Sequence, residues 1–225
     1  MGANKTLKMR KITLLFFGLV FSGVGYAQTA QSDLSIGIAF KNIPFQDNRL
    51  PAFMLESHYY VTNRWATGGN LAYTRQKFGH AFGLDARRTY LYLFSVNWAN
   101  RWEVVQTKKL SVHANLDAGI IVATLRDREN YEWVDSGYYY EDWYYVENQS
   151  KVYNKLNRDT YFSVQPSLGM SYKLFELSPK DKLGLHFTAN IGYQLAAGGG
   201  DFSTSNDFQS LSWFVGLKII GPTKE

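Results

Sequence analysis

The stretch Glu132–Glu147, with the sequence EWVDSGYYYEDWYYVE, has residue types suited to binding ions or large partners. It holds five carboxylates, two tryptophans and five tyrosines, and it has no basic residue. Carboxylate oxygens are ligands for calcium or magnesium, while Tyr and Trp offer a large contact area at low conformational cost. The candidate contact residues are Glu132, Trp133, Asp135, Tyr139, Glu141, Asp142, Trp143, Tyr145 and Glu147.

The same stretch also has a simpler interpretation. Its alternating tyrosines extend the neighbouring strands around a turn at Asp135-Ser136-Gly137, and its charges are solvated. The carboxylate spacing matches no defined calcium loop, so we expect no resident metal and no cofactor.

Histidines are the other residues that invite a chemical interpretation, because a hydrolase needs a base beside a nucleophile. The nearest arrangements are His113-Ala114-Asn115 and His186-Phe187-Thr188, and neither has a serine two residues from the histidine. His58 lies two residues from Glu56, yet the sequence fixes no nucleophile next to it. We therefore expect the chain not to be an enzyme.

The segment Leu110–Val122 has the clearest pattern among the elements that must position these residues. Every second residue from Leu110 is apolar, while the alternate positions include His113, Asn115 and Asp117. Successive side chains of a strand point to opposite faces, so one face is apolar over roughly 40 Å at about 3.3 Å per residue. Because the chain repeats this pattern and carries an export signal, we expect the apolar face to contact lipid.

The pattern predicts eight strands in a single domain, residues 28–225. The expected strands are Ser32–Lys41, Pro51–Thr62, Trp65–Gln76, Arg88–Ala99, Leu110–Thr124, Thr160–Leu174, Lys182–Leu195 and Phe208–Ile220. The longer connections are expected at Asn42–Leu50, Phe78–Arg87, Asn100–Lys109, Leu125–Asp159 and Ala196–Asp207. Proline cannot donate to a strand ladder, so irregular pairing is expected at Pro166.

The N-terminal segment Met1–Ala27 has the three parts of a secretory signal. Basic residues come first, the apolar run Ile12–Phe21 follows, and small residues end the segment. A run of about ten apolar residues is too short to span a bilayer as a helix, which needs about twenty. We expect residues 1–27 to be a cleaved signal peptide; the alternative is an anchor that stays attached.

Cleavage changes the charge of the protein. The whole chain has 24 Lys and Arg against 19 Asp and Glu, and removal of the basic residues Lys5, Lys8, Arg10 and Lys11 leaves 20 against 19. The nearly neutral mature chain gives no support to nucleic-acid binding. There are no cysteines, so neither a disulfide framework nor a thiolate metal site can form.

Charged residues and histidines recur on the polar face of the strands. An eight-stranded barrel has an interior only wide enough for side chains to fill, and buried charges there must pair. We therefore expect an internal hydrogen-bond and ion-pair core and no continuous water channel. Its expected members are Lys41, Glu56, His58, His113, Asp117, Lys173, His186 and Lys218.

Two segments carry a family resemblance. Tyr59–Gly69, YYVTNRWATGG, has a tyrosine, a hydrophobic residue, Val-Thr and two polar residues before a strand of small residues, and Val164–Tyr172 reads VQPSLGMSY. These segments resemble the strand-turn-strand signature and the later PSLGxSY strand of the outer-membrane β-barrel domain proteins common in Bacteroidetes. The resemblance implies an eight-stranded barrel of the OmpA/OmpX kind without catalytic residues.

The sequence thus predicts an all-β protein, an eight-stranded antiparallel up-and-down transmembrane β-barrel of the outer membrane. Its expected role is structural or one of surface interaction through the long aromatic and acidic loop. Its expected partners are outer-membrane lipid, lipopolysaccharide and an extracellular protein or glycan, with no nucleic acid, and we expect a monomer. The alternatives are a lipid A-modifying outer-membrane hydrolase or acyltransferase, and a soluble periplasmic lipocalin-like carrier.

Overall fold

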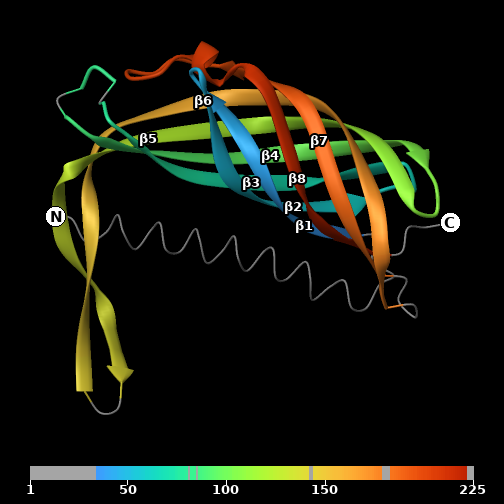
Figure 1. The fold of residues 1–225 in the computed structure, drawn as a ribbon, viewed down its shortest axis with the longest axis horizontal. Coiled ribbons are helices and arrows are strands. Elements are labelled where there is room, and N and C mark those ends of the chain that lie inside the picture. The colour runs from blue at the N-terminus through green and yellow to red at the C-terminus, as the bar shows by residue number, and fades with distance from the viewer. Residues whose placement is uncertain (1–33, 81, 85, 142–143, 179–182, 222–225) are drawn as a thin grey trace.

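The computed structural model describes residues 34–80, 82–84, 86–141, 144–178 and 183–221, so the expected signal peptide at residues 1–27 lies outside it. Eight antiparallel strands form a closed barrel in chain order (Figure 1). Among the described residues, no helix is long and apolar enough to cross a membrane. The strands are β1 (Leu34–Phe45), β2 (Asn48–Tyr60), β3 (Trp65–Phe78), β4 (Thr89–Gln106), β5 (Leu110–Glu141), β6 (Tyr144–Ser178), β7 (Leu183–Ala197) and β8 (Ser210–Ile220), with one 3-10 turn, η1 (Ser205–Phe208), between β7 and β8.

The first and last strands close the ring. Their pairing runs from Ser35 opposite Ile220 to Lys41 opposite Phe214, and the Gly221 amide donates to the Leu34 carbonyl at 3.0 Å. A closed ring leaves no unpaired strand edge. We call the end of the barrel at Leu34 and Gly221 the termini end, and the opposite end, which holds the β1–β2, β3–β4, β5–β6 and β7–β8 connections, the loop end. The predicted eight-stranded antiparallel barrel is confirmed.

Inward and outward residues alternate along the strands as predicted. On β5, Asn115 and Asp117 are buried, whereas Leu116 and Ile120 are exposed. The outward side chains of Phe40, Trp98 and Leu168 are 66%, 63% and 62% exposed. The barrel therefore has a reversed distribution of polarity, with apolar side chains outside and many polar ones inside.

The segment Leu125–Asp159 is not a loop, because β5 and β6 continue through it as a paired hairpin, so the simpler interpretation that it extends the neighbouring strands is confirmed. Figure 1 shows this hairpin leaving the barrel at the loop end and bending away from the barrel axis. The strands meet at Glu141 opposite Tyr144, so the turn is not at Asp135-Ser136-Gly137. A register shift lies there instead, which agrees with the tendency of glycine to mark bulges.

Two other connections were also predicted too long. β1 and β2 extend to a tight turn at Gln46-Asp47, because Ile43, Phe45 and Leu50 in the expected loop are buried in the barrel. In the other case, β4 runs on to Gln106 because the side chains of Arg101 and Glu103 point into the interior. Turn-favouring residue types in these segments were outweighed by the burial of alternate side chains.

Pro166 interrupts one of its two ladders, as expected. It stays in register with Leu116 on β5, but neither Gln165 nor Pro166 has a partner on β7. The pairing resumes at Ser167 without a change of register, so the irregularity is a gap and not a bulge.

The interior at the loop end is apolar, which the sequence analysis did not foresee. Phe45 stacks on Phe208 and Phe82 with ring centroids 5.3 and 5.7 Å apart, and Tyr161 stacks on Phe208 at 4.8 Å. Aliphatic side chains surround these rings, namely Ile43, Leu50, Met54, Leu91, Leu93, Ile121 and Leu125. We call this group the aromatic plug, because it fills the loop end of the barrel.

We predict that Gly68→Ala destabilises the barrel by about 1–3 kcal/mol, the usual range for forced overpacking. A Cβ at this position would overlap the carbonyl oxygen of Ser57 on the paired strand β2. Gly79→Ala is the control, because nothing lies within 4 Å of a Cβ there. Urea unfolding in detergent micelles, followed by tryptophan fluorescence, measures both; equal midpoints would contradict the tight approach of β2 and β3.

Candidate functional site

The interior between the aromatic plug and the termini end holds a network of charged and amide side chains. Its buried cations are Lys41, Arg101 and Lys218, and its buried carboxylates are Glu56, Glu103 and Asp117. The charges balance, which suits a space where an unpaired ion would be strongly unfavourable.

Lys218 on β8 and Glu56 on β2 form an ion pair within this network. Lys218 Nζ lies 2.7 Å from Glu56 Oε1, with both side chains almost completely buried. Arg101 carries a third charge close to Glu56 and Glu103, and its Nε donates to Asn115 Oδ1 at 3.1 Å. The ion pair thus links strands that pairing alone does not place next to each other.

Amide side chains relay the network across the barrel. Asn70 Nδ2 donates to Asp117 Oδ2 at 2.9 Å, Asn97 Nδ2 donates to Asn70 Oδ1 at 2.8 Å, and Ser163 Oγ donates to Asn97 Oδ1 at 3.1 Å. Lys41 Nζ donates to Gln165 Oε1 at 2.7 Å. These bonds join β1, β3, β4, β5 and β6 through the interior, and the space is filled by protein groups.

The structure places six of the eight expected interior residues inside the barrel and two at its mouth. Lys41, Glu56, His58, His113, Asp117 and Lys218 are buried. Lys173 lies at the termini end, where its Nζ pairs with Glu176 Oε1 at 2.6 Å and is partly exposed. His186 is half-buried and sits opposite both Lys173 and Lys218 in the strand ladders.

His113 and His58, which were considered for catalysis, lie inside the barrel. His113 is fully buried and its Nε2 lies 3.0 Å from Asn190 Oδ1, while Asn115 Nδ2 donates to the same oxygen at 2.6 Å. His58 is also buried inside the network. Among the described residues, no hydrogen bond joins a histidine ring to a serine or threonine hydroxyl, because the threonine that contacts a histidine, Thr89, donates to the His80 backbone carbonyl. No group of three or more His, Asp or Glu among these residues is placed to hold a metal ion.

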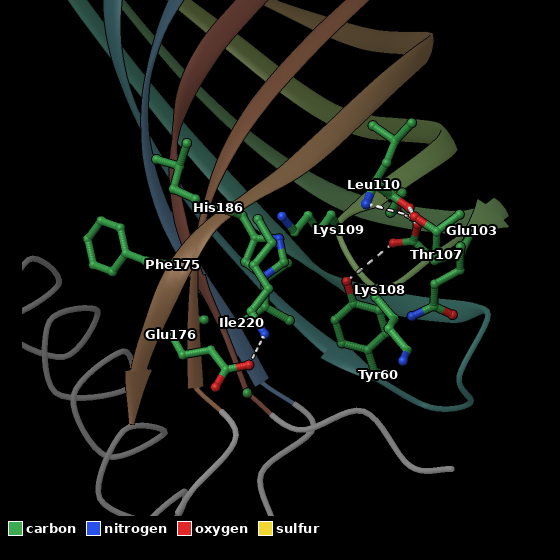
Figure 2. Close-up of a pocket in the computed structure, with 16 residues that line it drawn as sticks. Tyr60, Glu103, Thr107, Lys108, Lys109, Leu110, Phe175, Glu176, His186 and Ile220 are labelled. Atoms are coloured by element: carbon green, nitrogen blue, oxygen red, sulfur yellow. Dashed lines mark hydrogen bonds and ion pairs between the residues drawn. The ribbon is translucent and has the colours of Figure 1, made fainter. Parts of the chain in front are cut away.

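A cavity of about 620 Å³ opens at the termini end (Figure 2). Tyr60 donates its hydroxyl to Glu103 Oε1 at 3.3 Å in its wall, and Ser111 donates to the other oxygen of Glu103. Basic side chains of Lys108, Lys109 and Lys173 line the rim. The cavity has a mixed lining, in which Leu174, Phe175 and Ile220 lie beside these charged side chains. It opens at the end of the barrel opposite the hairpin, so it forms a separate surface.

The candidate contact residues belong to the β5–β6 hairpin. Glu132 and Trp133 are exposed and lie opposite Val152 and Lys151. For Asp135, Tyr139, Glu141, Tyr145 and Glu147 the structure describes the backbone, which pairs along the hairpin; Asp142 and Trp143 lie outside the described residues. The described members of this set therefore lie on one projecting ribbon of two strands.

Sequence reasoning missed two groups of residues. Arg101 and Glu103 were assigned to a turn, although their spacing of two continues the alternation of Asn97 and Ala99 and would have placed them inside. The second group consists of outward basic residues on β3 and β5, where Arg75, Lys77, Arg126 and Arg128 also follow a spacing of two. In both cases the signal was the strand period, which continues past the predicted strand ends for all of these residues except Arg75.

No family model and no curated protein matches this chain. Two similar solved structures are the neisserial surface protein A, with 11% identity and a TM-score of 0.48, and Ail, the attachment invasion locus protein of Yersinia pestis in complex with the heparin analogue sucrose octasulfate, with 16% identity and a TM-score of 0.44. Each alignment covers 84% of this chain and 96% of the other. The eight-stranded ring stands on the strand pairing of this chain itself.

We predict strong energetic coupling between Glu56 and Lys218. Removal of one partner leaves an uncompensated buried charge, so Lys218→Met alone should destabilise the barrel by about 3–5 kcal/mol. The double variant with Glu56→Gln should lose much less than the sum of the two single variants. Urea unfolding of all four proteins gives the coupling energy.

The exposed pair Lys173–Glu176 is the matched control for this cycle. The same substitutions there should give a coupling near zero, because solvent screens an exposed ion pair. Additive effects at Glu56 and Lys218 would mean that the buried pair does not stabilise the fold.

Proposed function

We propose that this chain is a small outer-membrane β-barrel protein, exported by the signal peptide of residues 1–27, that contacts extracellular proteins or glycans through its β5–β6 hairpin. The proposed protein is a monomer and has no catalytic role. The observation that carries the membrane assignment is the belt of exposed apolar side chains around a closed ring of strands.

The belt of exposed apolar side chains runs around the outer wall of the barrel. Its exposed members come from all eight strands, and they include Ile38, Phe40, Phe53, Leu55, Tyr73, Phe94, Trp98, Leu116, Ile120, Phe162, Leu168, Ile191, Leu195, Trp213, Val215 and Leu217. Soluble monomers rarely expose contiguous apolar patches of more than a few hundred Å². A lipid environment accounts for the belt, and the closed ring satisfies the backbone polar groups that hydrocarbon cannot.

The interior argues against a soluble lipocalin-like carrier. Such a carrier needs an open apolar cavity, whereas the loop end here is filled by Phe45, Phe208 and their neighbours, and the middle of the barrel holds the ion network. The distribution of polar and apolar side chains also differs from that of a carrier, which would turn its apolar face inward. Both features support a lipid-embedded barrel with a filled core.

The lipid A-modifying alternative finds little support in the side chains considered for it. A catalytic base must reach a substrate at the lipid-facing wall or at a mouth of the barrel. His113 is fully enclosed and bonded to Asn190, and His58 is buried beside the charged network. These contacts favour a structural role for both histidines.

The hairpin supports the contact role. β5 and β6 have 32 and 35 residues, whereas the other strands have 11 to 18, so their outer halves extend past the rest of the barrel. Tyr and Trp are concentrated there together with carboxylates, a composition suited to contact with a protein or a glycan. A paired ribbon presents these residues from a rigid base.

We predict that Leu168→Arg reduces the stability of the barrel in phosphatidylcholine bilayers by about 2–4 kcal/mol if this side chain lies near the bilayer midplane. Leu168 is exposed on β6, and a guanidinium there would contact hydrocarbon. Leu168→Ala is the control for side-chain size. The measurement is urea unfolding in lipid vesicles, and a Leu168→Arg protein as stable as the alanine variant would contradict the lipid-facing assignment.

We predict that the hairpin is dispensable for folding of the barrel and necessary for contact with extracellular proteins or glycans. Replacement of residues 134–150 by Asn-Gly joins Trp133 to Lys151, which already pair, through a favoured two-residue turn. The shortened protein should refold in detergent and keep a heat-dependent shift on a gel. Its binding to arrays of glycans and extracellular-matrix proteins should be lost.

A second variant separates the aromatic side chains from the hairpin backbone. Tyr138, Tyr139 and Tyr140 are replaced by threonine, which keeps strand propensity and removes the rings. Binding should fall in this variant as well. Full binding by the shortened protein would place the contact role elsewhere, and failure to refold would show that the hairpin is needed by the barrel.

A further inference from the structure

Basic and aromatic side chains alternate between strands on the outer wall at the loop end. In the ladders, Arg75 lies opposite Tyr92, and Lys77 lies opposite Tyr90, which in turn lies opposite Arg126. Tyr90 and Tyr92 belong to the outward set of β4, so these residues share the outer face. We call Arg75, Lys77, Tyr90, Tyr92, Arg126 and Arg128 the basic-aromatic patch.

The three arginines of this patch lie over tyrosine rings. The Arg75 guanidinium carbon lies 3.9 Å from the centroid of Tyr90 and 5.4 Å from that of Tyr92, and Arg128 lies 5.1 Å from Tyr90. Such contacts order long side chains that would otherwise be mobile, while the charged group keeps its hydrogen-bond donors available. The patch is therefore preorganised for an anion.

The hairpin base extends the patch. Tyr153 stacks on Tyr90 at 4.8 Å and on Tyr131 at 6.2 Å, and Lys151 Nζ lies 3.2 Å from the Tyr131 centroid. Arg126 Nη1 donates to the Tyr153 carbonyl at 2.8 Å, which ties the barrel wall to the hairpin. The basic surface thus continues from β3 to β6.

The cations of the patch have no carboxylate partner within 4 Å among the described side chains, where the ion pairs are Lys173–Glu176 and Lys218–Glu56. Asp127 lies between two patch arginines in sequence but is buried, and it accepts hydrogen bonds from the Glu129 amide and Asn130 Nδ2. The patch therefore has an excess of positive charge on the outer wall.

The patch lies next to the apolar belt in the strand register. Two residues before Arg75 on β3 comes Tyr73, which is opposite Phe94, and Phe94 is opposite Val122. In the next outward row, Arg75 and Tyr92 follow Tyr73 and Phe94, while Thr124 follows Val122 on β5 and Arg126 comes one row later. A lipid whose chains cover Phe94 would hold its headgroup at the level of Arg75.

From this register and charge we infer that the basic-aromatic patch binds the phosphate-bearing headgroup of a lipid in the surrounding leaflet. The inference rests on the proposed membrane location and adds the site and chemistry of lipid contact. Arginine supplies paired donors for phosphate oxygens, and the tyrosine rings keep the guanidinium planes in place. The acyl chains of the same lipid would lie along the apolar belt below.

The test is native mass spectrometry of the refolded mature chain in dodecyl maltoside. The probes are diphosphoryl lipid A, the same lipid A without its phosphates, and inorganic pyrophosphate. The wild-type protein should retain the phosphorylated lipid at least about tenfold more tightly than the dephosphorylated one, given the attraction of several basic residues to an anionic headgroup. Pyrophosphate should compete weakly, because it lacks the acyl chains.

Substitutions test whether the phosphorylated lipid binds at the basic-aromatic patch. The variant Arg75→Gln/Lys77→Gln/Arg128→Gln should lose the preference for phosphate, and Arg75→Lys/Arg128→Lys should keep part of it because the charge remains. The control Arg49→Gln/Arg64→Gln/Lys108→Gln removes the same number of arginines and lysines from exposed positions elsewhere, and it should bind as wild type does.

The outcomes separate this inference from the proposed function. Equal retention of the two lipids, an equal loss in the control variant, or full competition by pyrophosphate would each overturn the lipid-headgroup site. Insertion into phosphatidylcholine vesicles is measured separately by the heat-dependent gel shift. A protein that inserts but shows no phosphate preference refutes the patch alone, whereas a protein that does not insert refutes the membrane assignment on which the patch depends.

Discussion

The pairing of β1 with β8 is the interaction on which the rest of the structure depends. Without it, the strands would form an open sheet with two edges. The backbone amides and carbonyls along these two edges would then lack partners. In hydrocarbon each unsatisfied group is strongly unfavourable, so only a closed ring allows the apolar belt to face lipid. Closure with eight strands also fixes the size of the interior, which is just wide enough to be filled by side chains.

That limited space explains the division of the interior. Near the termini end, the charges of Lys41, Arg101 and Lys218 are balanced by three carboxylates and linked by amide side chains. Near the loop end, the aromatic plug replaces them, and it needs no polar partners. Asp159 joins the plug to the β7–β8 connection, because its carboxylate accepts hydrogen bonds from the amides of Asp201, Phe202 and Ser203. The two parts of the interior are thus filled by different means, one by paired polar groups and the other by apolar side chains.

The strand period predicted the fold and the face of the residues within the expected strands, as Leu116 outside and Asp117 inside illustrate. It did not predict strand ends, because local turn signals were given more weight than the continued alternation through Arg101 and Glu103. The ion pair of Glu56 and Lys218 was not predictable either. Both residues were expected inside, but their distance depends on the curvature of the ring, and β2 and β8 are not neighbours in it. Contacts across an interior need coordinates, whereas faces need only the period.

The projecting hairpin is stabilised by contacts at its base. An isolated two-stranded ribbon is at best marginally stable in water, so a projecting hairpin needs support from the body of the protein. Continuous pairing of β5 and β6 into the barrel supplies a fixed register, and the stack of Tyr153 on Tyr90 with Arg75 over Tyr90 holds the point of departure. A contact surface ordered in this way loses less conformational entropy on binding than a loop of the same length would. The basic-aromatic patch therefore anchors the hairpin to the barrel wall.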